Sequence, residues 1–225
     1  MNLLSKYGDQ LIDAFLTTIY LTLASLVGAL VIGTIIAAMR VSPVPIARGI
    51  AATYVTIFRN TPLTLIILFT SFGLYGTMGV SLASETSPNF LDDNNFRLAI
   101  LGLSVYTASF VAESLRSGIN TVPVGQAEAG RSLGMTFTQN ISIVVLPQAF
   151  RAVVGPLGSV VIALTKNTTI ASVIGVAEAS FLMKEMIENE AAIFVVGGIF
   201  ALGFMVLTLP TGLLFGYISK RLAVS

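Results

Sequence analysis

The chain has 225 residues, of which 55% are hydrophobic and 10% charged, and its 12 Lys and Arg nearly balance its 11 Asp and Glu. A mean hydropathy of +0.89 is typical of an integral membrane protein, and a net charge of +1 without a dense basic patch excludes nucleic acid as a partner. Because the chain contains neither Cys nor His, it lacks thiol chemistry, the commonest metal ligand and the usual general base near pH 7, so a membrane enzyme is disfavoured and no metal site is expected.

Five runs with few or no charges predict five membrane-spanning helices of an all-α, polytopic membrane protein. In chain order they are residues 14–39, 60–84, 98–112, 152–177 and 191–219. The first run is too long for a signal peptide and lacks a small-residue cleavage pattern, so we expect it to be retained. The third run is too short to cross a bilayer, so Glu113 or its neighbours are expected at membrane depth.

Basic residues gather on one side of the predicted spans, and acidic residues gather on the other. The linkers after the first and third runs and the C-terminal tail hold Arg40, Arg48, Arg116, Arg131, Arg151, Lys220 and Arg221. The opposite side holds Lys6, Arg97 and Lys184 among nine acidic residues. The positive-inside rule therefore puts the N-terminus outside and the C-terminus in the cytoplasm.

An apolar helix that begins near residue 49 is interrupted by Arg59, Asn60, Thr61 and Pro62. Pro62 lacks a backbone N–H and kinks the helix, and the freed backbone groups are tolerated in a membrane only against protein or a water-filled cavity. We therefore expect this segment to form a wall of a translocation path. For Arg59 itself, an anchor at the cytoplasmic membrane interface is an equally open alternative.

Ionisable side chains inside the predicted spans are candidates for a substrate path, because a charge in a bilayer is costly. Lys166 is expected near the middle of the fourth span, where hydroxyl and amide neighbours would help it receive a carboxylate. Alternatively, Lys166 snorkels or pairs with Glu113. Glu113 and Arg116 share one helix face, and they either form an internal ion pair or hold the charged groups of a substrate. The candidate path residues are Arg59, Asn60, Thr61, Pro62, Glu113, Arg116, Lys166, Asn167 and Thr168.

A stretch of small and mostly polar residues, 122–150, separates the third and fourth spans. It predicts a first short helix that ends at Gly134. Thr136 and Gln139 form a capping-box pattern for a second short helix, which Pro147 is expected to break. By composition alone this stretch could be a plain surface loop.

The first short helix has features that favour contact with another protein. Ala127, Ala129 and Gly130 give it a side with almost no side chain, over which another surface can approach closely. Glu128 and Arg131 lie three residues apart and can pair or cap. The stretch is therefore predicted to be a site at which another protein binds and transmits movement to this chain.

The order of these residues resembles the EAA loop of ATP-binding-cassette (ABC) importer permeases. The match in spacing covers Glu128-Ala129-Gly130, Gly134 and Val144-Val145-Leu146-Pro147, with Gly130 and Val144 as conservative departures. Three further segments, 59–63, 112–119 and 166–169, resemble recurrent motifs of polar amino-acid permeases. The combination is most similar to the glutamate uptake permeases of actinobacteria.

This resemblance implies the type I ABC importer permease fold, with residues 1–225 as a single transmembrane domain. It also implies that the first short helix is a cytoplasmic coupling helix seated in a groove of an ATPase. The expected coupling residues are Gln126, Ala127, Glu128, Ala129, Gly130, Arg131, Ser132, Leu133 and Gly134. The chain has no G-x-x-x-x-G-K-S/T phosphate loop, so ATP and Mg are expected in the partner ATPase, with no cofactor in this chain.

The resemblance implies a set of partners as well. They are an ABC ATPase dimer, a second permease chain that is identical or homologous, an extracellular solute-binding protein, an amino-acid substrate and the lipid bilayer of a bacterial cytoplasmic membrane. The expected function is import of polar amino acids by alternating access, with glutamate favoured and glutamine or aspartate as alternatives. An ion-coupled secondary transporter or a channel predicts an internal repeat or a complete pathway in one chain, and neither is evident.

Overall fold

The computed structural model describes residues 3–222, apart from the side chain of Phe137. All regular elements in this part of the chain are helical, which confirms the predicted all-α fold. The α-helices are α1 (Leu3–Val41), α2 (Pro45–Asn60), α3 (Leu63–Leu68), α4 (Phe90–Asn120), α5 (Val124–Ser132), α6 (Phe137–Gln139), α7 (Leu146–Asn167), α8 (Ala179–Glu190) and α9 (Ile193–Leu222). Two π-helical segments, η1 (Phe69–Thr77) and η2 (Asn140–Val145), and a 3₁₀-helix, η3 (Thr168–Ile174), extend them.

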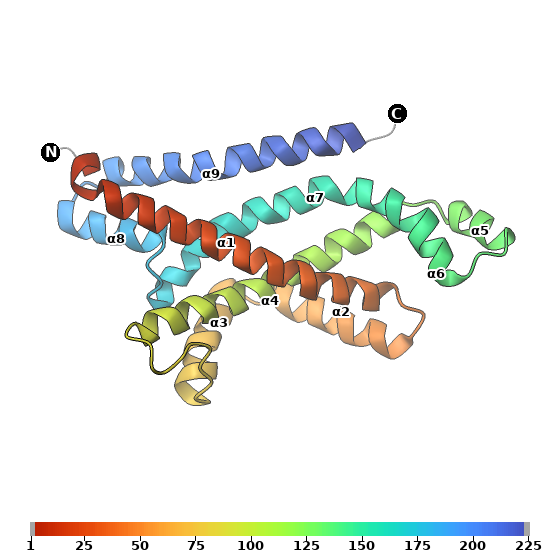
Figure 1. Ribbon diagram of the computed structural model, residues 1–225, viewed down its shortest axis with the longest axis horizontal. Coiled ribbons are helices and arrows are strands. Elements are labelled where there is room, and N and C mark those ends of the chain that lie inside the picture. The colour runs from red at the N-terminus through yellow and green to blue at the C-terminus, as the bar shows by residue number, and fades with distance from the viewer. Residues whose placement is uncertain (1–2, 223–225) are drawn as a thin grey trace.

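Four helical segments of the described chain are long and apolar enough to cross a bilayer: α1, α4, the continuous segment 140–174 and α9. A fifth candidate joins α2 to α3 and η1 across a bend of 103°. Counted as one broken span, this pair completes the five predicted spans. The first described residue of α1 and the last of α9 lie at opposite ends of the long axis (Figure 1), as an odd number of spans requires.

The second span differs from its prediction, because the chain breaks at residues 61–62 instead of kinking. Thr61 and Pro62 both adopt extended backbone with ψ of 131°. A residue that precedes proline is driven out of the helical region by the pyrrolidine ring. The side chains of Asn60 and Thr61 donate to carbonyls of the last turn of α2, at 2.7 and 2.8 Å. The helix inside the predicted run 60–84 is therefore shorter than that run: it starts at Leu63 and ends at Thr77, before the last glycine of the run, Gly79.

Pro147 was expected to break the second short helix, and this expectation is also wrong. The segments α6, η2 and α7 follow one another without a gap, and Pro147 is the second residue of α7. The π-helical turn of η2 comes directly before α7. Its wider turn leaves room for the pyrrolidine ring, and it avoids the α-helical bond that proline cannot make.

The core of the bundle is the parallel pair α1 and α4, with α7 packed beside it (Figure 1). The two helices touch closely at Gly33, where a Cβ atom would lie 2.6 Å from Cγ1 of Val111. The Tyr54 hydroxyl of α2 donates to the Val105 carbonyl of α4 at 2.7 Å. The central buried cluster joins α1, α3, α4, α7 and η3 through Leu21, Leu63, Ile67, Leu103, Leu164 and Ile174. By contrast, α9 lies at one edge with only two of its 30 residues buried.

Candidate functional site

The segment that contains α5 projects from one end of the bundle, beside the C-terminal end of α1 (Figure 1). α5 ends at Ser132, and Gly134 has a φ of +80°. The N–H of Gly134 donates to the Arg131 carbonyl at 2.9 Å, and the N–H of Met135 donates to the Gly130 carbonyl at 3.2 Å. This left-handed turn suits glycine, because other residues are strained there. The predicted end of the helix at Gly134 is confirmed.

The predicted capping box is also confirmed. The N–H of Gln139 donates to Oγ1 of Thr136 at 3.3 Å, and the N–H of Thr136 donates to Oε1 of Gln139 at 2.9 Å. These reciprocal bonds satisfy two backbone donors at the start of α6. They fix the direction in which the chain leaves the turn after α5.

Two of the three small residues of α5, Ala127 and Gly130, pack against the same chain, whereas Ala129 is exposed. Asn140 of η2 is buried, and its Nδ2 donates to the Ala127 carbonyl at 2.5 Å. A Cβ atom at Gly130, which is also buried, would lie 3.0 Å from Oδ1 of Asn140. Within the described residues this Oδ1 has no hydrogen-bond partner. Ala127 and Gly130 therefore set the packing of α5 on η2.

The opposite side of α5 is accessible to a partner. Its exposed residues are Gln126, Glu128, Ala129, Arg131, Ser132 and Leu133. Leu133, directly after α5, is 80% exposed and adds an apolar side chain to this side. Glu128 and Arg131, which could have paired, form no ion pair within the part of the chain that is described. Both charges are thus available to a second protein.

A cluster of charged side chains joins α1 to α4 at the same end of the bundle. The Arg116 guanidinium donates to Glu113 through both Nε and Nη2, so the internal ion pair is present. Arg40 of α1 adds a second cation, with its Nη2 3.7 Å from Oε2 of Glu113. The sequence reading used Arg40 only as a cytoplasmic charge. Its position directly after the first apolar run was the available signal.

Glu113 also lines a polar cavity of about 410 Å³ between α2 and α4. The lining residues are Arg40, Val55, Thr56, Arg59, Asn60, Phe110 and Glu113. The guanidinium carbon of Arg59 lies 5.3 Å from the centre of the Phe110 ring, in a cation–π contact. The cavity thus brings together Arg59, Asn60 and Glu113 from the predicted path residues. Thr61 and Pro62 form the break next to it, and Arg116 is bound to Glu113 outside the lining.

A second cavity of about 420 Å³ shares Phe110 with the first and lies between α4 and α7. Its polar lining includes Thr107, Ser159 and Asn167. Thr107 is buried, and its Oγ1 has no hydrogen-bond partner among the described residues. The two cavities place cations, one carboxylate and neutral polar groups along one face of α4.

Lys166 lines neither of these two cavities. It is exposed near the end of α7, where the helix tightens into η3. The hydroxyls of Thr165, Thr168 and Thr169 donate to backbone carbonyls of their own turns. Within the described chain Lys166 forms no ion pair with Glu113.

Glu178, at the opposite end of the bundle, is a buried carboxyl and one of the nine acidic residues that the charge pattern put on the outer side. It caps α8, and its side chain accepts from the N–H groups of Ser180 and Phe181 at 2.9 and 3.0 Å. Burial raises the pKa of Glu178 to about 7, although the two backbone donors and Lys184 oppose the rise. Lys184 in turn donates to Oγ of Ser172 at 2.8 Å.

Comparisons with known proteins agree with this geometry. Residues 29–224 match the family described as binding-protein-dependent transport system inner membrane component. The chain is 60% identical to the glutamate transport system permease protein GluC of Corynebacterium efficiens over 96% of both chains, and 32% identical to the probable glutamine ABC transporter permease protein GlnM of Bacillus subtilis over 95% of this chain and 93% of the relative. Its structure resembles that of an amino acid ABC transporter crystallised with histidines, with a TM-score of 0.85, 28% identity and coverage of 97% and 96%.

Proposed function

The chain belongs to the family of binding-protein-dependent transport system inner membrane components, and from that premise we propose that it carries glutamate through the membrane as the permease subunit of an ATP-driven importer. It is a multi-pass permease of the amino-acid ABC transporter type. The observation that carries the choice of glutamate is the 60% identity to glutamate permeases across nearly the whole chain. The family also disfavours the alternative of a secondary transporter or channel.

The polar cavity supports an anionic amino acid as the substrate. Its lining carries Arg40 and Arg59 against Glu113 alone, so it holds more positive than negative charge. Arg59 has a cation–π contact but no ion pair within residues 3–222. Its planar guanidinium can take a substrate carboxylate in two parallel hydrogen bonds. Glu113 can accept the ammonium group, and Thr107 and Asn167 offer neutral polar groups further along α4.

The segment from α5 to Gly134, the predicted coupling helix, supports the proposal that an ATPase drives the movement. We place its exposed face, around Glu128 and Leu133, in a groove of one subunit of an ABC ATPase dimer, where ATP and Mg are bound by that partner. Closure of the two ATPases would move α5, and η2 would transmit this movement to α7 because the two segments are continuous. A ligand that shifts a two-state protein does so only through its different affinity for the two states.

The remaining assignments belong to the same proposal. The coupling end lies in the cytoplasm of a bacterial cell, and α8 lies outside, with the N-terminus outside and the C-terminus inside. A second permease chain, identical or homologous, completes the path. An extracellular solute-binding protein delivers the amino acid to the outer end.

Uptake of radiolabelled glutamate by proteoliposomes tests the proposal. The vesicles contain the permease with its co-purified ATPase, and the binding protein is added outside. Glu128→Lys and Gly134→Leu are expected to abolish ATP-dependent uptake while the permease still inserts into the membrane. The matched controls are Asp9→Lys, an exposed carboxylate at the other end, and Gly49→Leu, a helical position with no atom within 4 Å of an added Cβ.

Two results would contradict the proposal separately. Normal uptake by both coupling variants would remove the role of α5. Accumulation of a neutral or basic amino acid, with no accumulation of glutamate, would remove the substrate assignment and leave the coupling role intact.

A further inference from the structure

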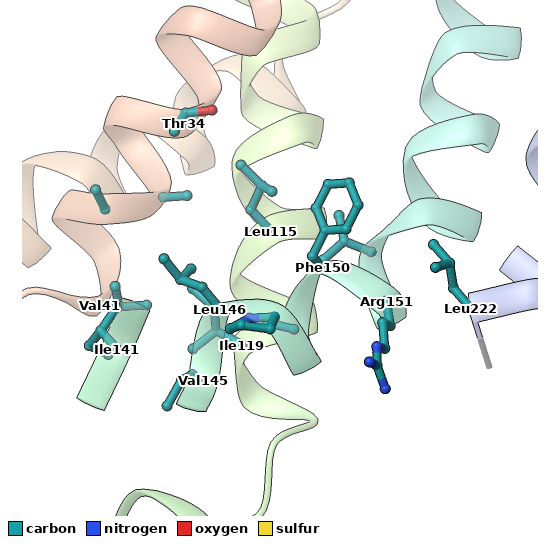
Figure 2. A pocket seen from close by; sticks show the side chains of 15 residues that line it. Thr34, Val41, Leu115, Ile119, Ile141, Val145, Leu146, Phe150, Arg151 and Leu222 are labelled. Atoms are coloured by element: carbon teal, nitrogen blue, oxygen red, sulfur yellow. The ribbon is translucent and has the colours of Figure 1, made fainter. Parts of the chain in front are cut away.

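A large cavity of about 700 Å³ lies at the end of the bundle that carries α5 and η2, apart from the two polar cavities. It is enclosed by the ends of α1 and α4, by η2 and the start of α7, and by the last described residue of α9. Figure 2 shows Val41, Leu115, Val145 and Phe150 around it, with Leu222 at its edge. A volume between about 300 and 1,000 Å³ is typical of a site that binds a small molecule.

The chemistry of the lining is that of a membrane-facing pocket with one charged end. All lining side chains are apolar except those of Thr34 and Arg151, and no carboxylate is among them. An amino acid would lose its hydration there without gaining polar partners, which is unfavourable. A hydrocarbon chain has no such cost, because it carries no hydrogen-bonding group.

Arg151 supplies a free cation at one side of this cavity. It is exposed, and among the described residues it forms neither a hydrogen bond nor an ion pair. In Figure 2 its guanidinium points away from Thr34 and Phe150, so the charge lies at one end and the apolar surface at the other. Phe150, which is 61% exposed, presents an aromatic ring between the two.

Further positive charge lies beside the cavity at the end of α9. Lys220 and Arg221 occupy the last turn of that helix, directly before Leu222 of the lining. This turn is close to α7, because a Cβ atom at Gly155 would lie 3.3 Å from Oγ of Ser219. Basic pockets between transmembrane helices commonly bind anionic lipid head groups.

We propose that this cavity is a binding site for one anionic phospholipid of the adjoining leaflet, with an acyl chain along Leu115, Val145 and Phe150 and the phosphate on Arg151. The lipid would fill the space between the ends of α1 and α4 and the start of α7, which protein side chains leave open. The site is independent of the transported substrate, so it stands whether or not glutamate is carried.

Tryptophan fluorescence tests the site directly, because the chain contains no Trp. Phe150→Trp puts a single reporter into the lining, in the full chain reconstituted in phosphatidylcholine vesicles. Dibrominated phosphatidylglycerol, an anionic quencher, is compared with dibrominated phosphatidylcholine at equal mole fraction. The reference reporter is Phe194→Trp, which replaces a 92% exposed side chain in the first turn of α9, at the opposite end. We expect a preference for the anionic lipid at position 150 and none at position 194.

Two further variants, each in the Phe150→Trp background, separate the charge from the cavity. Arg151→Gln should lower the relative affinity for phosphatidylglycerol about fivefold, as expected for one arginine at a membrane surface, whereas Arg48→Gln at the same end should not. Ala38→Phe, which fills the lining from α1, should reduce quenching by both lipids, and Ala24→Phe, exposed in mid-helix, should not. Equal preference at the two reporters, or a preference that survives Arg151→Gln, would overturn the proposal.

Discussion

The packing of Gly130 on Asn140 makes a quantitative prediction about the coupling segment. Gly130→Ala adds a Cβ atom 3.0–3.1 Å from three atoms of the Asn140 side chain. If the amide retreats, its hydrogen bond to the Ala127 carbonyl must lengthen. Overpacking a well-filled contact costs about 1–3 kcal/mol, whereas alanine is favoured over glycine in a helix by about 1 kcal/mol. We therefore expect Gly130→Ala to leave the α5–η2 contact unchanged or weaker by up to about 2 kcal/mol.

The sign of this effect should reverse when the amide is removed. In an Asn140→Ala background the added methyl group meets no side chain, so only the helix preference of about 1 kcal/mol remains. The pair should thus show a coupling free energy of about 1–3 kcal/mol in a double-mutant cycle. Asn140→Ala alone should weaken the contact by about 1 kcal/mol, the net value of one hydrogen bond.

Hydrogen exchange of the α5 amides, followed by mass spectrometry on the purified permease in nanodiscs, measures these differences as opening equilibria. A change of about 1.4 kcal/mol is a tenfold change in exchange rate where opening limits protection. Glutamate uptake by the same four proteins shows whether a looser contact transmits less movement. Strictly additive effects of the two substitutions would refute the reasoning, because they would mean that Asn140 does not limit the space at Gly130.

Three other perturbations have distinct outcomes. Arg59→Gln should raise the KM for glutamate uptake about 10- to 100-fold, which corresponds to the loss of one hydrogen bond to a charged group. Lys166→Gln should change this KM less than about twofold, because Lys166 lies outside both polar cavities at α4. Glu113→Gln should lower the free energy of unfolding by about 1–3 kcal/mol in denaturant titrations, since it leaves Arg40 and Arg116 without a carboxylate. Arg40→Gln should lower the same free energy by about 1 kcal/mol or less. Burial raises the pKa of Glu178 from 4.5 to about 7, so its protonation adds stability that is complete below pH 4.5 and is lost as the pH rises through 7. The free energy of unfolding, obtained from thermal denaturation, should therefore fall by about 3 kcal/mol between pH 4.5 and 7. Glu178→Gln should remove this dependence on pH.

The sequence predicted the parts of the structure that depend on local chemistry. The capping box of Thr136 and Gln139 and the left-handed turn at Gly134 are set by a few neighbouring residues, and both form as expected. The number of spans follows from uncharged length, which is also a local property.

Features that depend on neighbouring helices were harder to predict. Proline usually ends a helix, yet the π-helical turn directly before Pro147 lets this helix continue. Lys166 was expected near mid-span because the span was counted from its apolar residues; α7 tightens into η3 at Thr168, and the side chain of Lys166 is exposed in the single chain. Arg40 reaches Glu113 only because α1 packs along α4, and its sequence separation gives no hint of that contact.

The length of α1 also affects how the protein fits its bilayer. Its uncharged stretch, residues 14–39, extends roughly 39 Å at about 1.5 Å per residue, whereas the hydrocarbon layer is about 30 Å thick. The excess must be absorbed by tilt or by local thickening of the lipid. Since α1 is in close contact with α4 at Gly33, neither helix can change its inclination alone. The lipid thickness around the permease therefore acts on both helices together, and it adds an elastic contribution to the energy of every conformation that changes their angle to the membrane normal.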